Sequence, residues 1–584
     1  MGQSFHQLLK ILAFLLPIIL LAASRLPAVV KVLQKFSGLQ SRHVADTIFT
    51  NGVIWTADDK LPWADSIAVR NGKILHIGSS MSMQDLVGSN TNHVDLEGKF
   101  VTPGFMDSHV HFIPGGLQLQ MLNLHSTRSR EELEEQVAMV AQEKEKGSWI
   151  LGFGWNHENW GGNLPNKSWL DSITKNHPVW LTRIDGHMGL ANSIALAKVG
   201  VNSETHDPQG GAIIRDERNV PTGVLVDAAM MLVSKDIPQS SQEECREALK
   251  RASKHALSRG VTSVVDFGRF VPGASTRRVW DDFFEVYMWA DAVGSMDVRV
   301  SIYFPLETFI EVADLVKEKG HVLSPWVHVG GVKAFADGSL GSSTALFHEP
   351  YLDDVNNYGL QVADPDWLLQ ATTEAMDSSL QVAIHAIGDA ANDQILSLYE
   401  AALGNQSSLP YLRPRIEHAQ HLSTEAPARF GALGIIASVQ PQHLLDDAYP
   451  ALRKLGKERF KKSYLFQSLL QGGARVTFGS DWPVTKLDPL EGIQMATKRV
   501  PHGFEQPWLV EQRISVEDAL KGYTIVGAYS SHMEENIGSL SQGKYADFII
   551  LSCNLFNLSM EVVPFVLATY VGGLPVYTIQ KEAT

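Results

Sequence analysis

Apolar and polar residues alternate differently along the chain, and the changes divide it into regions. Residues 46–100 consist of short β-type runs separated by turns, and the Asn-Gly steps at Asn51 and Asn71 are typical of hairpin loops. From about residue 101, short apolar runs alternate with longer segments of helical period, which indicates repeated βα units. After residue 530 the β-rich pattern returns. We therefore expect the two β-rich ends to form one discontinuous domain.

The central region contains apolar runs that are expected to be the strands of a parallel sheet. There are eight of them: 101–107, 261–267, 298–304, 329–335, 380–385, 414–418, 434–440 and 475–481. Eight parallel strands with intervening helices predict a (β/α)₈ barrel. Two further strand-like runs, near 149–152 and 179–184, lie in the long gap after the first strand. We interpret that gap, about 115–250, as an insertion beside the barrel mouth.

The expected fold is an α/β (β/α)₈ TIM-like barrel with a discontinuous small β-sandwich domain and an insertion after the first barrel strand. The chain of 584 residues is long enough for all three parts. The expected domains are an N-terminal hydrophobic signal or anchor segment with its linker (1–44), the first part of the sandwich (45–100), the barrel with its insertion (101–530) and the second part of the sandwich (531–584).

The N-terminal segment has its own pattern. Residues 11–24 are apolar and uncharged, but the run is shorter than the roughly 20 residues of a spanning helix. Its length resembles the core of a cleaved signal sequence. A helix that continues past Arg25 would instead form an uncleaved single-pass anchor, the favoured interpretation. Both place the protein in the endomembrane system, in the endoplasmic reticulum or the perinuclear membrane. Asn-X-Ser sequons that permit glycosylation start at Asn166, Asn405 and Asn557.

Composition excludes some classes of partner and site. The net charge of −15 argues against nucleic acid, because phosphate binding needs a basic surface. The two cysteines, Cys245 and Cys553, allow one disulfide at most and no cysteine-rich metal site.

Metal-ligand residue types stand at the ends of four predicted barrel strands. His109 and His111, two positions apart, point to the same face of the first strand. His385, His418 and Asp481 end the fifth, sixth and eighth strands. The carboxyl ends of barrel strands form the rim where active sites lie. The set therefore predicts a metal site at this rim, which no single member would do.

Lys333 lies inside the apolar run of the fourth strand. A buried lysine is costly unless it is paired or modified. One interpretation is a lysine that extends to the rim. The other is an amine carbamylated by CO₂, whose carboxylate bridges two metals.

These residues resemble those of the amidohydrolase superfamily and, within it, the YtcJ-like group, which includes N-substituted formamide deformylase. The resemblance runs from about residue 46 to 576. It rests on the blocks VTPGFMDSHVH, VWLTRIDGHMGLANS, PTGVLVDAA, GVKAFADGSLGSSTALF, VAIHAIGDAAND, RIEHAQHL and FGSDWPV. The N-terminal segment also looks like that of a plant member whose name implies a link to phytochrome far-red light signalling.

The resemblance implies a site with two divalent metals. One metal would be held by His109, His111 and Asp481 and the other by His385 and His418, with carbamylated Lys333 and a hydroxide as bridges. Zinc is the expected metal, since imidazole and carboxylate suit it. Manganese, iron and nickel stay open, as does a mononuclear site with unmodified Lys333.

The mechanism that follows uses hydroxide made by the metals. Asp481 would take a proton from the attacking group and deliver it to the leaving nitrogen. His187 is assigned to the substrate pocket, where it polarises the carbonyl; a structural rim histidine is the alternative. Trp155 and Asp185 are further candidates for substrate binding, and Asp337 is expected to orient the substrate or a metal ligand.

Three other residues have weaker expectations. Glu417 is expected on the opposite side of its strand from His418, in a structural or supporting role, and His443 as a solvated loop residue. Asp227 stands where many relatives are expected to have glutamate, which shortens the side chain by one methylene.

The expected function is hydrolysis of a linear amide-like C–N bond, such as that of an N-substituted formamide; a cyclic amide or an imine is an alternative. A second class stays open: a membrane-anchored signalling or binding protein on an amidohydrolase scaffold with little or no turnover. The presence of every expected ligand favours catalysis. The expected partners are a small amide-like substrate and, through the N-terminal segment, a membrane. A homodimer stays open.

Overall fold

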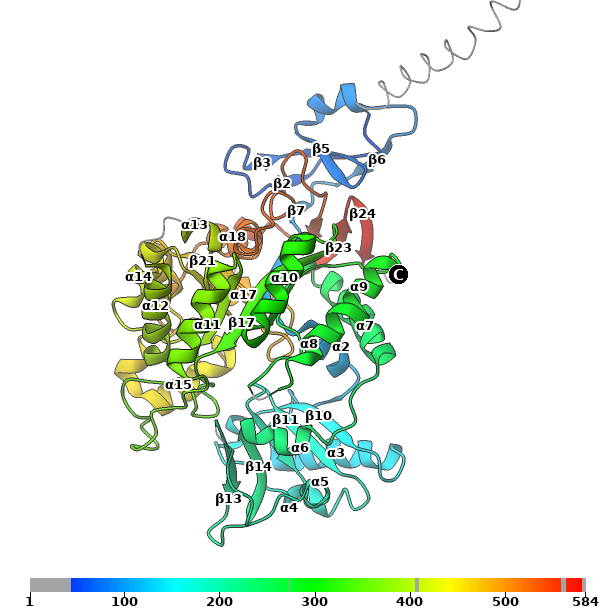
Figure 1. The fold of residues 1–584 in the computed structure, drawn as a ribbon. Helices are drawn as coiled ribbons and strands as arrows, with labels where there is room; N and C mark the ends of the chain where they lie inside the picture. Colours follow the sequence, from blue (N-terminus) through cyan, green and yellow to red (C-terminus); the bar gives the residue numbers. More distant parts are fainter. Residues whose placement is uncertain (1–43, 209, 273, 405–408, 558–562, 580–584) are drawn as a thin grey trace, which may run out of the picture.

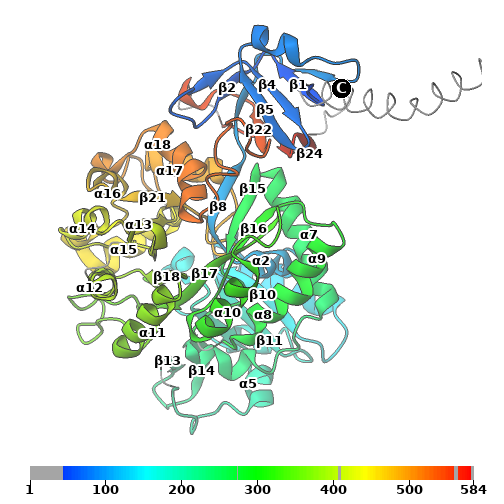
Figure 2. The ribbon, with the colours of Figure 1, turned by 45° about the horizontal axis from the view of Figure 1, so that its top comes forward.

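The computed structural model describes residues 44–208, 210–272, 274–404, 409–557 and 563–579. They form a β-sandwich at one end of the molecule, a barrel in the middle and a second α/β domain at the opposite end (Figures 1 and 2). The apolar N-terminal segment lies outside the described residues. Within the described part of the chain, no helix has both the length and the apolar character needed to cross a membrane.

The barrel predicted from the sequence is confirmed. Its strands are β8 (Phe105–Val110), β15 (Val261–Asp266), β16 (Arg299–Pro305), β17 (Val327–Phe335), β18 (Gln381–Ala386), β19 (Arg415–His418), β20 (Ile436–Val439) and β21 (Arg475–Phe478). All neighbouring strands of this sheet pair in parallel. The two edges meet just beyond β21, where the N–H of Asp481 donates to the His109 carbonyl and the N–H of His111 donates to the Trp482 carbonyl, both at 2.7 Å.

Helices surround the barrel on the outside (Figure 2). They are α2 (Phe112–Gln118), α7 (Gln242–Ser258), α8 (Arg277–Asp282), α9 (Met288–Ala292), α10 (Phe309–Lys319), α11 (Pro365–Asp377), α12 (Asp389–Leu403), α13 (Leu409–Leu412), α14 (Ala426–Leu433), α15 (His443–Phe460), α16 (Phe466–Gln471), α17 (Pro489–Lys498), α18 (Val516–Gly522) and α19 (Ile525–Ser530). Helix α7 begins at a capping box, in which Ser241 accepts from the Glu244 N–H and Glu244 accepts from the Ser241 N–H. It packs against α2, where a Cβ on Gly116 would lie 2.1 Å from the Ala248 carbonyl oxygen.

The first apolar run divides between two sheets. A single strand is expected at 101–107, but β7 (Phe100–Pro103) pairs within the sandwich and β8 begins the barrel. Gly104 lies between them, and a Cβ there would lie 2.3 Å from Thr262 Oγ1. A continuous apolar run cannot reveal this division, because both halves are buried.

The sandwich consists of two sheets from the two ends of the described chain. One sheet contains β1 (Thr47–Thr50), β4 (Ser66–Arg70), β5 (Lys73–Gly78) and β6 (Asn92–Asp95); the other contains β2 (Val53–Trp55), β3 (Trp63–Ala64), β7, β22 (Phe548–Leu551), β23 (Val566–Val571) and β24 (Leu574–Thr578). Phe49 packs edge-on against Phe548 with ring centroids 5.0 Å apart, which joins segments about 500 residues apart in sequence.

The inserted domain lies between α2 and α7. Its mixed sheet contains β9 (Leu122–Asn123), β10 (Ile150–Trp155), β11 (Val179–Arg183), β12 (Met188–Ala191), β13 (Gly211–Arg215) and β14 (Pro221–Asp227), with the helices α3 (Arg130–Glu143), α4 (Ser168–Asp171), α5 (Ser193–Val199) and α6 (Met231–Ser234). Alternate residues of β11 belong to different apolar clusters, with Val179 and Leu181 in one and Trp180 in the other. The sheet is therefore covered on both faces.

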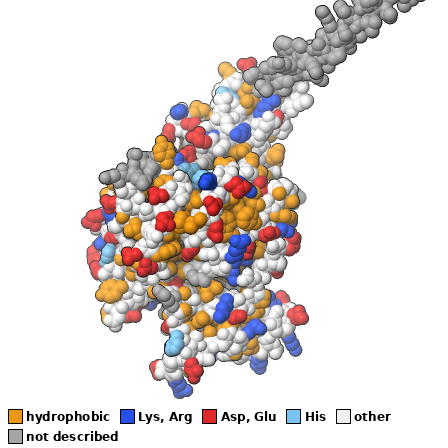
Figure 3. Space-filling model, viewed as in Figure 1, with side chains coloured by type: hydrophobic (Ala, Val, Ile, Leu, Met, Phe, Trp, Pro, Cys, Tyr) orange, Lys and Arg blue, Asp and Glu red, His pale blue; other side chains and the backbone are white. Residues whose placement is uncertain are grey.

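Charged side chains are mixed on the face of the molecule that Figure 3 shows. Lys and Arg side chains lie among Asp and Glu, with apolar side chains between them. The described part of this face has no broad surface of one charge.

Candidate metal centre

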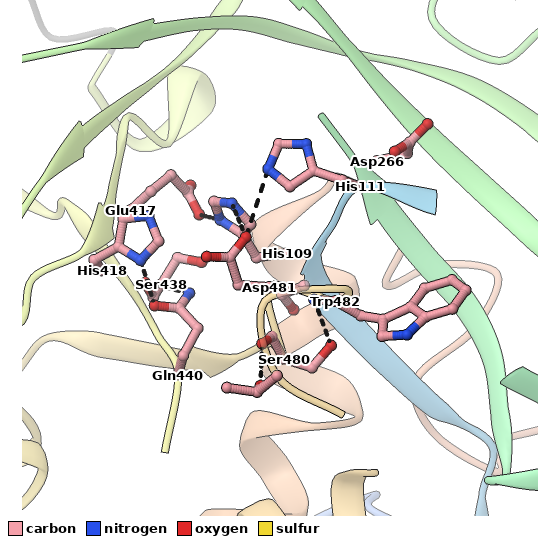
Figure 4. Close-up of polar contacts among 12 residues, drawn as sticks. His109, His111, Asp266, Glu417, His418, Ser438, Gln440, Ser480, Asp481 and Trp482 are labelled. Carbon is pink, nitrogen blue, oxygen red and sulfur yellow. Dashed lines mark hydrogen bonds and ion pairs between the residues drawn. The ribbon is translucent and has the colours of Figure 1, made fainter. Parts of the chain in front are cut away.

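The ends of four barrel strands bring potential metal ligands together, and Figure 4 shows those from β8, β19 and β21. His109 belongs to β8, His418 ends β19, and Asp481 follows β21. One ligand atom from each lies within 4.8 Å of the others, and all three side chains are buried. His385 on β18 lies beside them, with its ring centroid 4.4 Å from that of His418. His111 begins the loop after β8, and its Nε2 lies 3.5 Å from Asp481 Oδ1.

A buried chain of polar contacts fixes the His109 ring. Its Nδ1 is 2.6 Å from Glu417 Oε2, and Arg415 Nε donates to Glu417 Oε1 at 2.8 Å. Arg415 also donates to the Ser108 carbonyl at 2.8 Å. With its proton on Nδ1, His109 keeps a lone pair on Nε2, which lies 3.4 Å from Asp481 Oδ1. Glu417 thus holds a potential metal ligand in place, which is the supporting role expected of it as one alternative.

The other three histidines are oriented in the same manner by one ring nitrogen each. The contacts are His111 Nδ1 with the Gly268 carbonyl at 2.7 Å, His418 Nδ1 with Gln440 Oε1 at 2.8 Å, and His385 Nε2 with the Gly338 carbonyl at 3.0 Å. Because a carbonyl or amide oxygen accepts the N–H, the second nitrogen of each ring keeps its lone pair. The four rings are therefore prepared to bind a cation, His385 through Nδ1 and the others through Nε2.

Burial keeps these rings neutral. It lowers the pKa of His109, His385 and His418 well below the usual histidine value, and that of His111 to about 4. Nearby Lys333 acts in the same direction on all four. A neutral imidazole is the form that binds metal.

Asp481 supplies the test of whether a metal fits. Its Oδ1 is buried and has no hydrogen-bond partner among the described residues, although it faces the Nε2 atoms of His109 and His111. Burial raises the pKa of this carboxyl, and Lys333 opposes that rise. Unsatisfied buried carboxylate oxygens are costly, and two facing lone pairs add to the cost. A divalent cation bound by the three side chains would satisfy them all.

Two of these ligand positions have unusual backbone conformations. His418 has φ of 76° and Asp481 has φ of 57°, in the left-handed region that residues other than glycine seldom adopt. Such strain often accompanies functional sites, because the surrounding fold must hold it in place. Asp107 helps to do so, since its Oδ1 accepts from the backbone N–H groups of Ser480 at 2.9 Å and His109 at 3.2 Å.

Asp107 and Gln440 support the site but were not singled out from the sequence. The sequence position of each residue could have indicated its role. Asp107 lies two residues before His109 and hence on the same strand face, and Gln440 directly follows β20, as the other polar residues follow their strands.

Lys333 is buried within the barrel and is only 1% exposed. Its amine lies 4.4 Å from the ring centroid of Phe267 and 5.0 Å from that of Phe335. Burial lowers the pKa of this amine, although the carboxylates of Glu417 and Asp481 oppose the effect. The side chain does not extend to solvent, and it lines the same cavity as the four histidines.

That cavity has a volume of about 350 Å³ and is shared between the barrel and the inserted domain. The barrel contributes the potential ligands and the segments that follow β8 and β15. The inserted domain contributes Phe153, Trp180, Thr182, Asp185, His187, Asp227, Met230, Met231 and Ser234. The insertion therefore forms one side of the cavity that contains the potential metal ligands.

His187 and Asp227 form a pair on the inserted-domain side. His187 Nδ1 lies 2.6 Å from Asp227 Oδ1. Burial alone would lower the pKa of His187, but Asp227 and then Asp185 raise it to about 9. His187 is therefore protonated at neutral pH, and its second N–H is available to a substrate oxygen. Asp227, one methylene shorter than glutamate, orients the His187 ring through this contact.

Asp185 is placed at the cavity by an ion pair and a hydroxyl. Arg183 Nη1 lies 2.8 Å from Asp185 Oδ2, and Ser339 donates to the same oxygen at 2.6 Å. Burial alone would raise the pKa of Asp185, but the positive charges of Arg183 and His187 and the hydrogen bonds from Ser339 and Arg183 hold it below its usual value. This residue stays ionised.

A second cavity of about 60 Å³, lined mainly by residues with polar side chains, shares part of this lining. Asp185, His187, His385, His418 and Asp481 line both spaces. The smaller one also contains His443, which is buried rather than solvated. Its Nε2 has no hydrogen-bond partner in the described structure and lies 3.7 Å from Asp481 Oδ2.

The structure does not bring Trp155 or Asp337 to the wall of either cavity. Trp155 is fully buried in the inserted domain, where its indole donates to the Leu181 carbonyl at 2.7 Å. Asp337 is also fully buried, and its carboxylate accepts from the backbone N–H groups of Leu346, Ile387 and Gly388 at 2.8, 3.0 and 2.8 Å. Asp337 Oδ1 also lies 3.5 Å from His385 Nε2, so this carboxylate adjoins a potential metal ligand and does not line the cavity.

Comparison with known proteins agrees with the geometry. The amidohydrolase family profile matches residues 92–577. The protein LONG AFTER FAR-RED 3 of Arabidopsis thaliana is 52% identical over 91% of this chain and 92% of its own. The amidohydrolase YtcJ of Bacillus subtilis is 32% identical over 88% of this chain and 95% of its own. The N-substituted formamide deformylase of Arthrobacter pascens is 26% identical over 91% of this chain and 98% of its own.

Among solved structures, a metal-dependent hydrolase of Pyrococcus horikoshii OT3 has a similar fold. Its TM-score is 0.69 at 29% identity, over 88% of this chain and 98% of that one. These similarities confirm the resemblance inferred from the sequence motifs.

Proposed function

Because this chain belongs to the amidohydrolase family, we propose that it is a metal-dependent hydrolase that cleaves the C–N bond of an amide or N-substituted formamide. The observation that supports metal dependence most directly is the buried, unpartnered Asp481 Oδ1, which faces the lone pairs of two neutral histidines. The similarity to an N-substituted formamide deformylase supports the choice of bond.

We propose two zinc ions as the metals. The ligands would be His109, His111 and Asp481 for one ion, His385 and His418 for the other, and a carbamylated Lys333 for both. Support comes from the free nitrogen of each ring and from the burial of the Lys333 amine, since a lowered pKa favours the neutral form that reacts with CO₂. When bound, such metals lower the pKa of water so that hydroxide is available near neutral pH.

The chain itself contributes two polar groups to the reaction. The protonated His187 donates its second N–H to the substrate carbonyl oxygen and stabilises the negative charge that develops there. Asp481 accepts the proton of the attacking water and delivers it to the leaving nitrogen. Both side chains are largely buried, which strengthens both interactions.

A hydrolysis screen tests this proposal. Zinc-loaded protein is incubated with N-substituted formamides, linear amides and amino-acid conjugates, and released amine is measured. The Asp481→Asn variant is the negative control, and Asp314→Asn, an exposed site on α10, is the matched control. Release by the wild type and by Asp314→Asn, but not by Asp481→Asn, supports the proposal. No release from any amide would favour a scaffold without turnover.

On the similarity to the Arabidopsis protein, we further propose that this chain acts in far-red light signalling. We propose that residues 1–44 direct it to the endomembrane system. A fluorescent fusion with and without these residues tests the location. Rescue of a far-red response in a plant line lacking the gene, by the wild type but not by Asp481→Asn, would tie the signal to catalysis; rescue by both would separate them.

A further inference from the structure

The large cavity is lined by an arginine with an unused hydrogen-bond donor. Arg278 lies on α8, at the segment that follows β15, and its Nε is buried without a hydrogen-bond partner in the described structure. The carboxylate of Asp282 acts on Arg278 electrostatically but is hydrogen-bonded by Arg269, which donates to its two oxygens at 2.8 and 2.7 Å. Burial and then the adjacent Arg269 lower the pKa of Arg278, but a guanidinium keeps its charge.

Most of the other charged groups of the cavity are paired or belong to the potential metal ligands. Asp185 pairs with Arg183, and His187 pairs with Asp227. Asp481 and Lys333 belong to the metal centre. Among the described residues that line the cavity, Arg278 is thus the cation that lacks a carboxylate of its own.

The wall around Arg278 is mainly apolar. It includes Leu117, Met121, Phe153, Trp180, Met230, Met231, Val271, Pro272 and Phe335. A ligand that fills this space would be apolar over most of its surface and would have one anionic group to meet the guanidinium.

The difference in size between the two cavities indicates how such a ligand lies. Both spaces meet at the potential metal ligands, so the bond to be cleaved lies between them. The polar space of about 60 Å³ admits only a small acyl group, such as formyl or acetyl. The space of about 350 Å³ holds the larger, amine part of the molecule.

We propose that Arg278 binds a carboxylate on the amine part of the substrate. The substrates would then be N-formyl or N-acetyl derivatives of apolar amino acids, or of other apolar amines that bear a carboxylate. This inference rests on the proposed function. Water adds its oxygen to the acyl carbon as the C–N bond breaks, and the nitrogen gains the hydrogen. The products are a small carboxylic acid and an amine that still bears its carboxylate.

Two substrates that differ only in the carboxylate test the proposal. N-formylphenylalanine and N-formylphenethylamine are compared with zinc-loaded wild type, Arg278→Ala and Arg278→Lys. The expected result is that Arg278→Ala loses roughly tenfold to a hundredfold more kcat/KM on the acid than on the neutral amide, mainly through KM. Arg278→Lys should recover part of this loss. Arg277→Ala, on the same helix with a side chain 70% exposed, is the control and should leave both rates unchanged.

A binding measurement separates this proposal from the proposed function. Calorimetry compares 3-phenylpropionate with 3-phenylpropanol, neither of which has an amide to cleave. Weaker binding of the acid to Arg278→Ala supports the Arg278 site even if no amide is hydrolysed. Equal binding of the acid to both proteins would place it at the metals and overturn the proposal. Equal losses on both formamides would do the same, while leaving the amidohydrolase function intact.

Discussion

The barrel and the inserted domain contribute different parts of one site. The barrel presents potential metal ligands from strand ends, and buried hydrogen bonds orient His109, His385 and His418. The inserted domain presents the protonated His187 and part of the apolar wall opposite. Rigid strands hold a metal with the accuracy that coordination requires, whereas an inserted domain can vary in sequence without disturbing that geometry. Changes in the two regions should therefore alter different measurable properties.

The largest effect is expected in the barrel, at Asp481. Asp481→Asn should reduce kcat by about a thousandfold or more, because it removes both the proton carrier and a potential metal ligand. The unfolding temperature should change little, since Oδ1 has no partner within the described protein. Steady-state kinetics and thermal unfolding check this, with Asp314→Asn as control. Normal turnover would remove Asp481 from the mechanism.

Lys333→Ala should also impair the barrel part of the site, because it should lower the metal content of the protein. We expect the zinc content to fall from about two per chain to one or fewer, and kcat to fall about a hundredfold or more. Short carboxylates such as propionate should restore part of the activity, because they can occupy the place of the carbamate. Elemental analysis and rescue assays measure both, with the exposed Lys317→Ala as control. Unchanged zinc and activity would contradict the carbamate.

His187→Asn sharpens the comparison from the inserted domain. It should lower kcat by roughly a hundredfold to a thousandfold, as loss of a donor to the developing oxyanion does, while zinc content stays at the wild-type value. Loss of zinc would show that the inserted domain also builds the metal centre. Unchanged zinc content in His187→Asn, in contrast to the fall expected in Lys333→Ala, would show that His187 is not a metal ligand.

The same histidine predicts a pH dependence. Since the pKa of His187 is raised to about 9 in the folded protein, protonation stabilises the fold below the usual histidine pKa, and this stabilisation is lost as pH rises through about 9. Wild-type kcat/KM should fall over the same alkaline range, and His187→Asn should lack that fall. An identical alkaline limb in both proteins would assign it to another group.

The smallest expected effect on the site comes from Glu417, which contacts the potential ligand His109. Glu417→Gln retains an acceptor for His109 but removes the charge, so zinc affinity should fall about tenfold to a hundredfold. Chelator competition measures the affinity, and near-ultraviolet circular dichroism checks that Arg415 still packs. Unchanged affinity would show that the hydrogen bond alone, without its charge, orients His109.

The sequence by itself determined the barrel and the identity of its potential ligands. Apolar runs of strand length alternate with helical segments, and polar residues end those runs, so chain order alone predicts a shared rim. The motifs around these residues also identified the family, which the comparisons confirm.

Only the tertiary structure decided which residues meet across the site. Asp227 pairs with His187 although they are 40 positions apart, and Glu417 meets His109 across 308 positions. Trp155 and Asp337 lie in promising motifs but are committed to internal hydrogen bonds, and Gly104 divides an apolar run between two sheets. Periodicity reports which face of an element is buried, and it contains no information on what that face packs against.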